Sequence, residues 1–268
     1  MFYSDYHVHT NFSGDSNTPP ETMIQKAIDL GLEKICITDH YDADFPNEDI
    51  SFVFDVDTYF KKLKYLKEKH SKKIEILIGV ELGLQPDLTD IYTKLLNDYP
   101  FDFVIGSSHL IDKIDPYRGR YYENKTEYNA YSYYLKSIIN NIKAFSSFQV
   151  YGHLDYIVRY GPYENKLITC DSYKEILDKL LLSLIHLGKG IEINSSGLKY
   201  GLGFPHPNLQ IIKRYRELGG EIITIGSDAH VPEHLCYDFK IIYSLLKDIG
   251  FKYYTIFVNQ KPEFIKIP

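Results

Sequence analysis

The sequence predicts a single α/β barrel that spans residues 1–268, and two observations lead to this fold class. Short and nearly continuous apolar runs alternate with helical patterns about seven times along the chain, as expected for parallel strands that are covered on both faces. Most of these runs also end in His, Asp or Glu. The carboxyl ends of the strands converge on one rim in a closed barrel, whereas an open sheet spreads them along a line. The polar ends therefore favour the barrel.

Seven runs are predicted to be strands, and the segments KICITD and EIITIG are typical of them because their interiors are apolar. The strands are expected over residues 3–9, 34–39, 75–81, 103–108, 149–153, 190–194 and 222–227. Helical patterns lie between them, and the first begins with Pro20 and is followed by Gly31, the usual asymmetry of helix ends. The helices are expected over residues 20–30, 57–69, 171–187, 208–218 and 232–249.

The composition limits the partners that this chain is expected to have. It carries 30 Lys and Arg against 36 Asp and Glu, a net charge of -6, and no basic run forms a stripe. This balance argues against nucleic acid or a membrane surface as the main partner, but it leaves a small anionic substrate open. No apolar segment approaches the ~20 residues of a membrane span, and the N-terminus lacks a signal-peptide pattern. The three cysteines are widely spaced, which suits a reducing compartment, so a cytoplasmic protein is expected.

Candidate metal ligands stand at the ends of the first and third predicted strands. His7 and His9 alternate along the first strand, so both imidazoles share a face and can reach one ion. Glu81 follows a buried run directly, and an unpaired carboxylate there would be costly, so a cation is expected beside it. Because a carboxylate can bridge two ions, Glu81 is expected to lie at the centre of the site.

The other predicted strands end in the same residue types. His40 follows Asp39, which is expected to orient an imidazole. His109, His153, Asp228 and His230 end later strands, and Asp15 lies in the first loop. Six of the ten histidines thus stand at strand ends, and six independent structural explanations are improbable. A mixture of imidazole and carboxylate without thiolate favours Zn, Mn or Fe.

Seven motifs in a fixed order carry a family resemblance: HVHTNFSGD, ITDH, IGVELG, GSSHLID, YGHLDYI, EINSSGLKYG and IGSDAH. Together they cover essentially the whole chain, which resembles the PHP (polymerase and histidinol phosphatase) superfamily, above all its stand-alone histidinol-phosphate phosphatases. The resemblance implies a distorted (β/α)7 TIM-like barrel with its metal site at the C-terminal rim of the strands. It also implies a trinuclear centre, so two to three divalent ions (Zn, Mn or Fe) are expected.

The resemblance also implies how the ligands divide among the ions. The first ion would be held by His7, His9, Glu81 and Asp228. A second would share Glu81 and take His109 and His153, and a third would take Asp15, His40 and His230. Many relatives have His where this chain has Asp15, so the third site is the one at which this sequence departs from the family pattern.

The activity implied by the resemblance is the hydrolysis of L-histidinol phosphate in histidine biosynthesis. Glu81 and Asp228 would act through ions that lower the pKa of bound water from about 15.7 towards ~7. Arg159 would bind the phosphoryl oxygens and neutralise their charge, with Lys199 as a second cation. His206 is the alternative phosphate contact if Arg159 does not serve.

Substrate contacts beyond the phosphate are less defined by the sequence. Asp42 and Tyr117 are the candidates for the histidinol group. Residues 112–128 form a long polar stretch, which is either a loop over the rim that recognises the substrate or an ordinary surface loop.

Three alternatives stay open beside histidinol phosphate. They are a nucleic-acid phosphodiester, a protein phosphotyrosine, and a metal-binding protein without activity. Amidohydrolases also begin with an HxH strand, but they often place a lysine at the end of the fourth strand. Ser108 and His109 stand there in this chain, which favours phosphoester chemistry.

Overall fold

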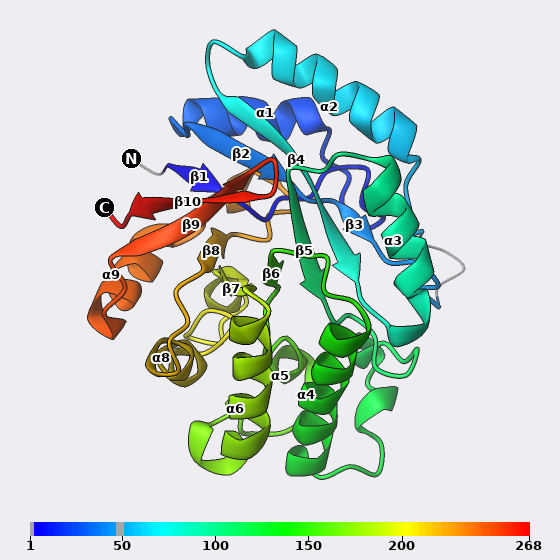
Figure 1. The fold of residues 1–268 in the computed structure, drawn as a ribbon, viewed down its shortest axis with the longest axis vertical. Helices are drawn as coiled ribbons and strands as arrows, with labels where there is room; N and C mark the ends of the chain where they lie inside the picture. Colours follow the sequence, from blue (N-terminus) through cyan, green and yellow to red (C-terminus); the bar gives the residue numbers. More distant parts are fainter. Residues whose placement is uncertain (1–2, 47–50) are drawn as a thin grey trace.

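The computed structural model describes residues 3–46 and 51–268, and its main feature is a largely parallel sheet that curls into a barrel (Figure 1). The strands are β1 (Ser4–Asp5), β2 (Lys34–Ile37), β3 (His40–Tyr41), β4 (Glu75–Gly83), β5 (Phe103–Ser107), β6 (Val150–Tyr151), β7 (Gly190–Asn194) and β8 (Ile223–Gly226). Their order is β1-β2-β4-β5-β6-β7-β8, and β3 pairs with the second half of β4. The barrel closes where the backbone N–H of Tyr6 donates to Ile225 O (3.2 Å) and the backbone N–H of His9 donates to Ala229 O (2.9 Å).

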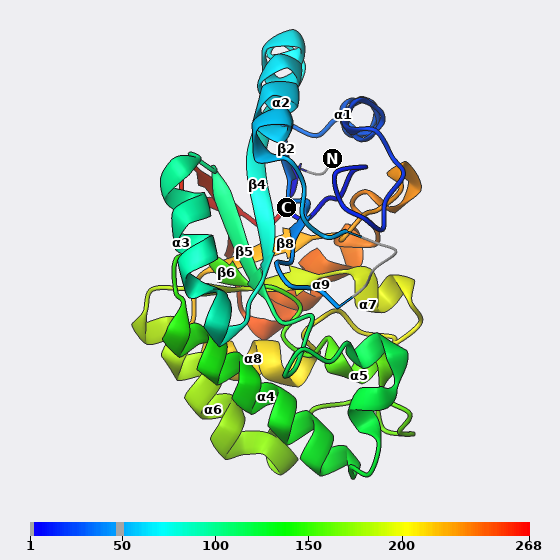
Figure 2. The ribbon, with the colours of Figure 1, turned by 90° about the vertical axis from the view of Figure 1, so that its right-hand side faces the viewer.

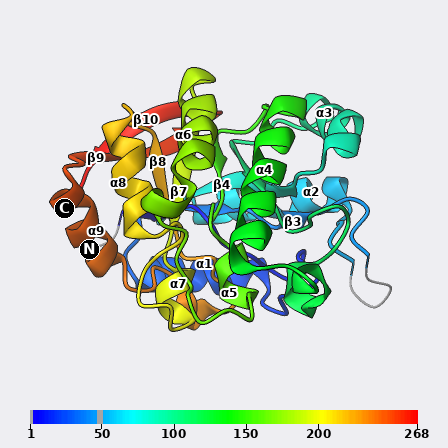
Figure 3. The ribbon, with the colours of Figure 1, turned by 90° about the horizontal axis from the view of Figure 1, so that it is seen from below.

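Helices surround the sheet, as the view from below shows (Figure 3). They are α1 (Pro20–Asp29), α2 (Val56–His70), α3 (Thr89–Asp98), α4 (Glu127–Ala144), α5 (Ile157–Tyr160), α6 (Cys170–His186), α7 (Ser196–Lys199), α8 (Leu209–Glu217) and α9 (Phe239–Ile249). In Figure 2, α2 stands at one end of the molecule and α4 and α6 pack together at the other. Within the described ranges, no helix has both the length and the apolar character needed to cross a membrane.

The predicted fold class is confirmed, and each of the seven predicted runs contains a strand. In five of the seven runs the observed strand ends before the predicted run does. The predicted helix over residues 232–249 is wrong in its first part. A short 3-10 helix (Pro232–His234) is followed by positive φ angles at Cys236 (54°) and Asp238 (51°), so α9 begins only at Phe239. The backbone N–H of Cys236 is held by Asp5 Oδ2 (2.9 Å), which fixes this loop beside β1.

A C-terminal hairpin, absent from the predicted strands, lies against the amino ends of the barrel strands. It consists of β9 (Tyr253–Val258) and β10 (Lys261–Lys266), which pair antiparallel. Tyr6 donates its hydroxyl to Phe257 O (3.0 Å), and the ring of Phe257 stacks on that of Phe103 with centroids 5.4 Å apart. The hairpin therefore covers the end of the barrel opposite to the predicted site.

Candidate metal centre

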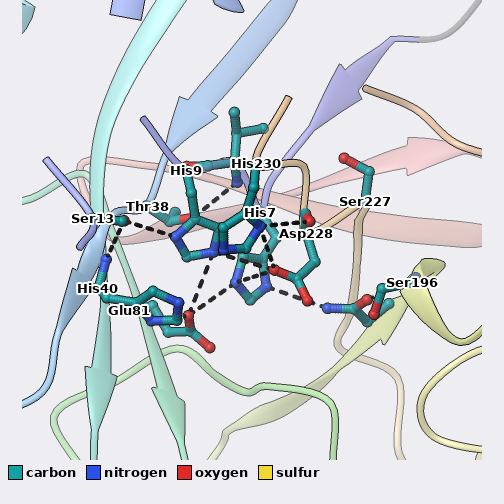
Figure 4. A network of polar contacts seen from close by, with 12 residues as sticks. His7, His9, Ser13, Thr38, His40, Glu81, Ser196, Ser227, Asp228 and His230 are labelled. Carbon is teal, nitrogen blue, oxygen red and sulfur yellow. Dashed lines mark hydrogen bonds and ion pairs between the residues drawn. The ribbon is translucent and has the colours of Figure 1, made fainter. Parts of the chain in front are cut away.

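The first two candidate ligands project inward just beyond β1. His7 and His9 are fully buried, and between them Val8 N donates to Thr38 Oγ1 (3.0 Å), which joins this stretch to the end of β2. Both Nε2 atoms face the same carboxylates (Figure 4). The distance to Glu81 Oε2 is 3.1 Å from His7 Nε2 and 3.6 Å from His9 Nε2. Asp228 Oδ1 lies 3.3 Å from His9 Nε2.

Glu81 lies at the middle of the cluster, fully buried on β4. Its Oε2 is 2.9 Å from His40 Nδ1. Its Oε1 is 3.2 Å from His109 Nε2 and 2.9 Å from His153 Nε2. Ser107 also donates its hydroxyl to Oε1 (2.6 Å). One carboxylate thus faces imidazoles from several strands, as expected for a ligand that two ions share.

The remaining candidates lie together at the outer edge of the cluster. Asp15 Oδ2 is 3.1 Å from His230 Nε2 and 3.6 Å from His40 Nε2. Asp228 Oδ1 approaches His230 Nδ1 at 3.6 Å. The structure therefore brings together all nine residues that the sequence singled out as metal ligands, although their coordination of ions stays a prediction.

The polar atoms that face the centre of the cluster fit a bound cation. His7 Nε2, His9 Nε2, His40 Nδ1 and Glu81 Oε2 are buried. Although some of them lie close to one another, none makes a hydrogen bond of normal geometry among the residues that the structure describes. Several groups of three such residues bring their ligand atoms within 4.8 Å of one another. Buried polar atoms are normally satisfied, and nitrogen and carboxylate oxygen donors suit Zn and related transition metals. These residues are therefore able to hold metal ions.

The electrostatics of the cluster lead to the same conclusion. Burial raises the pKa of Glu81, but the imidazoles of His7 and His109 outweigh it and hold this pKa well below its usual range. Burial lowers the pKa of His109, but Asp42 and Glu81 outweigh it and raise this pKa to about 10. The carboxylates thus favour a positive charge beside them in the site. A divalent cation supplies that charge without protonating the imidazoles.

A pocket of about 490 Å3 opens above the cluster. Among its lining residues are Asp15, His40, Asp42, Phe45, Phe52, His109, Asp115, Tyr117, Arg118, His153, Tyr156, Arg159, Tyr160, Tyr200, Asp228 and His230. Three of the five predicted substrate contacts, Asp42, Tyr117 and Arg159, are therefore on its wall. The stretch over residues 112–128 reaches the pocket through Asp115, Tyr117 and Arg118. Its part in recognition stays a prediction.

The other two predicted substrate contacts have partners within the protein and are not among the residues that line this pocket. Lys199 donates from Nζ to Asp228 O (3.0 Å). His206 is 1% exposed, and its Nδ1 lies 2.5 Å from Asp155 Oδ1. The sequence motifs predicted that both residues lie near the rim. Their contacts with Asp228 and Asp155 appear only in the structure. Their role in binding substrate stays a prediction.

The comparison with known families gives a match to the PHP domain over residues 5–196. The chain belongs to the PHP domain family. It is 34% identical to the histidinol-phosphatase of Lactococcus lactis over 96% of this chain and 95% of that protein. It is 33% identical to the probable histidinol-phosphatase of Clostridium acetobutylicum over 92% and 94%.

A solved structure resembles this PHP domain over nearly its whole length. The histidinol phosphate phosphatase from Lactococcus lactis, complexed with zinc, L-histidinol and phosphate, superimposes with a TM-score of 0.88 at 33% identity. The match covers 98% of this chain and 100% of that one. The barrel and its family are therefore shown by sequence and structure alike.

Asp39 holds the imidazole of His9 indirectly, through the hydroxyl of Ser13. It was expected to orient an imidazole, and the structure shows that it accepts hydrogen bonds from the backbone and hydroxyl of Ser13 (3.1 and 2.6 Å). Ser13 Oγ in turn lies 3.0 Å from His9 Nδ1. The carboxylate thus fixes the hydroxyl that holds the ring of His9.

Two further carboxylates contact imidazole Nδ1 atoms directly. Asp42 Oδ2 lies 2.6 Å from His109 Nδ1, so this pocket residue also holds a candidate ligand. Glu192 Oε1 lies 2.5 Å from His7 Nδ1. Sequence reasoning missed Glu192, although a charged residue inside the apolar run GIEIN was a usable signal, because such a group must find a partner when it is buried.

Proposed function

We propose that this chain is a metal-dependent phosphomonoesterase that hydrolyses L-histidinol phosphate to L-histidinol and phosphate, a step of histidine biosynthesis. The observation that carries the proposal is the cluster of nine ligand-type residues, six of which line a pocket that also has Arg159 on its wall. The similarity to histidinol-phosphatases over almost the whole chain supports the substrate. A pocket of about 490 Å3 suits a small metabolite.

Two to three divalent ions (Zn, Mn or Fe) are proposed to occupy the cluster. His7, His9, Glu81 and Asp228 would hold one ion, Glu81, His109 and His153 a second, and Asp15, His40 and His230 a third. Such ions lower the pKa of water towards neutrality and neutralise the charge of a phosphoryl group. Asp15 is the outermost of these ligands, since its side chain is 37% exposed, and we expect the third ion to bind most weakly.

Arg159 is proposed to bind the phosphate. A guanidinium stays charged at any physiological pH and offers paired donors that match two phosphate oxygens. Its Cζ lies 3.3 Å from the ring centroid of Tyr200 and 5.0 Å from that of Tyr160. These rings restrict the guanidinium before substrate arrives, which lowers the entropy lost on binding.

The leaving group, histidinol, carries an amino group and an imidazole, which acidic and aromatic side chains can receive. Asp42 and Tyr117 line the pocket on the side of His109 and α5. We propose that they contact this part of the substrate. Lys199 supports the site from outside the pocket by holding the backbone carbonyl of Asp228.

The test is an assay of the purified protein with Zn, Mn or Fe against a panel of phosphoesters. The panel contains L-histidinol phosphate, a phosphotyrosine peptide and a nucleic-acid diester. We expect L-histidinol phosphate to have the highest kcat/KM and a chelator to abolish its turnover. Faster turnover of another ester would reassign the substrate. No turnover of any ester by protein with bound metal would indicate a metal-binding protein without this activity.

A further inference from the structure

Glu192 is a buried carboxylate on β7 that lies between two of the candidate ligands. It is 1% exposed. Its Oε1 lies 2.5 Å from His7 Nδ1, and its Oε2 accepts from His153 N (3.0 Å) and Asn194 Nδ2 (3.1 Å). The neighbouring strand leaves room for it, because a methyl group at Gly226 would lie 2.5 Å from Oε1.

The hydrogen-bond pattern around Glu192 determines which nitrogen of His7 carries a proton. The backbone N–H of His153 can only donate. The amide of Asn194 also donates, because its oxygen already accepts from Ser196 N (2.9 Å). An ionised carboxylate accepts at both oxygens. His7 therefore donates from Nδ1, so Nε2, which lies 3.1 Å from Glu81 Oε2 and 3.9 Å from Asp228 Oδ1, is the nitrogen left to bind an ion.

We propose that Glu192 is a positioning residue, which selects the Nδ1–H form of His7 and holds the turn at His153 with the same carboxylate. This inference rests on the proposed metal centre, in which His7 and His153 belong to different ions. One side chain thus prepares ligands for two neighbouring ions. A carboxylate that holds the outer nitrogen of a ligating histidine orients the ring and increases its basicity.

The argument requires a carboxylate rather than any polar group of the same shape. In Glu192→Gln the side chain has one acceptor and one donor end. If the oxygen faces His7, the NH2 group meets the donors of His153 and Asn194. If the oxygen faces those donors, the NH2 group meets His7 Nδ1 and forces the proton onto Nε2, the atom needed for the metal. Either arrangement damages the centre.

The experiment measures zinc binding, by competition with a chelator, and needs no substrate. We expect Glu192→Gln to weaken the binding of at least one ion by about 10–100-fold. The matched control is Asp102→Asn, which also changes a buried carboxylate that accepts backbone N–H groups, here those of Ile78 (2.9 Å) and Asn259 (3.3 Å) at the other end of the barrel. The control is expected to keep wild-type zinc affinity even if its Tm falls. Folded Glu192→Gln with wild-type affinity would overturn the inference.

A second measurement on the wild-type protein covers the case in which Glu192→Gln does not fold. Long-range 1H–15N NMR of histidine in the zinc-loaded protein reports the protonated nitrogen of each ring. We expect Nδ1 of His7 to carry the proton, and an unprotonated Nδ1 would contradict the inference. If wild-type protein binds zinc and hydrolyses histidinol phosphate, but His7 has the other form, only this inference fails. If it binds no zinc, the proposed function and the inference fail together.

Discussion

Strand β4 carries a glutamate near each end, and the two residues differ in almost every respect. Glu75 begins the strand, is 40% exposed and pairs with Lys34 of the neighbouring strand. Glu81, six positions further, is fully buried and faces five imidazoles. The same residue type on the same strand thus belongs to a partly buried ion pair at one end of the barrel and to the centre of a candidate metal site at the other.

This difference extends to the two ends of the whole barrel. The amino end is covered by the hairpin, where Tyr6, Phe103 and Phe257 pack through rings and a hydrogen bond. The carboxyl end is lined by buried imidazoles and carboxylates, and several of their inward atoms, such as His7 Nε2 and Glu81 Oε2, lack hydrogen bonds among the described residues. The comparison separates stability from function: one end is closed by apolar packing, and the other keeps polar atoms available for ligands.

The largest effect is expected from removing the central carboxylate. Glu81→Ala should abolish both metal binding and phosphatase activity, because the imidazoles around it lose the ligand that two ions are proposed to share. Glu75→Ala on the same strand is the matched control and should leave both unchanged, since Glu75 pairs with Lys34 away from the candidate ligands. Elemental analysis and turnover of L-histidinol phosphate measure the result. Near-normal turnover in Glu81→Ala would contradict the shared-ligand arrangement.

At the amino end, a substitution is expected to lower stability and to leave metal binding unchanged. Phe257→Ala removes a ring that is 4% exposed, and substitutions of this kind destabilise a protein by about 3–5 kcal/mol. Denaturant unfolding should show this loss, whereas the zinc affinity of the folded variant should equal that of wild type. A variant with reduced zinc affinity and unchanged stability would show that the two ends are not independent.

Within the carboxyl end, phosphate binding should be separable from metal binding. Arg159→Ala should lower kcat/KM for L-histidinol phosphate by about tenfold or more, because a hydrogen bond to a charged group contributes roughly 1.5–3 kcal/mol. Its metal content should be that of wild type. Arg216→Ala serves as the control and should have no effect, because this half-exposed arginine lies near Glu221 (3.8 Å), does not line the pocket and is no candidate ligand. Full activity of Arg159→Ala would remove its phosphate role.

A pH dependence should also distinguish the metal-free from the zinc-loaded protein. Because Asp42 and Glu81 outweigh burial and raise the pKa of His109 to about 10, its protonated form stabilises the metal-free fold. This contribution is complete below the unfolded pKa of about 6.5 and is lost as pH rises towards about 10. The Tm difference between zinc-loaded and metal-free protein should therefore widen over this range. A difference that narrows would contradict the assigned charge state.

The sequence determined the fold class and the candidate ligands, because both depend on local order. A strand that is buried on both faces must be apolar, and a charged residue directly after it must face the rim. For this reason His7, Glu81 and Asp228 could be selected before any contact was known, and the structure places them together. The hairpin of β9 and β10 was missed, although YYTIFV is a strand-like run, because the predicted alternation of strands and helices had already ended at β8.

Only the tertiary structure decided which groups hold the ligands and which face the pocket. Glu192 contacts His7 across 185 positions of the chain, and no local pattern specifies a pair at that separation. Lys199 and Arg159 are both basic residues just beyond strand ends, yet Arg159 lines the pocket while Lys199 binds a backbone carbonyl. Strand periodicity specifies the face on which a side chain begins, whereas the direction of a loop after the strand depends on the packing of segments distant in the sequence.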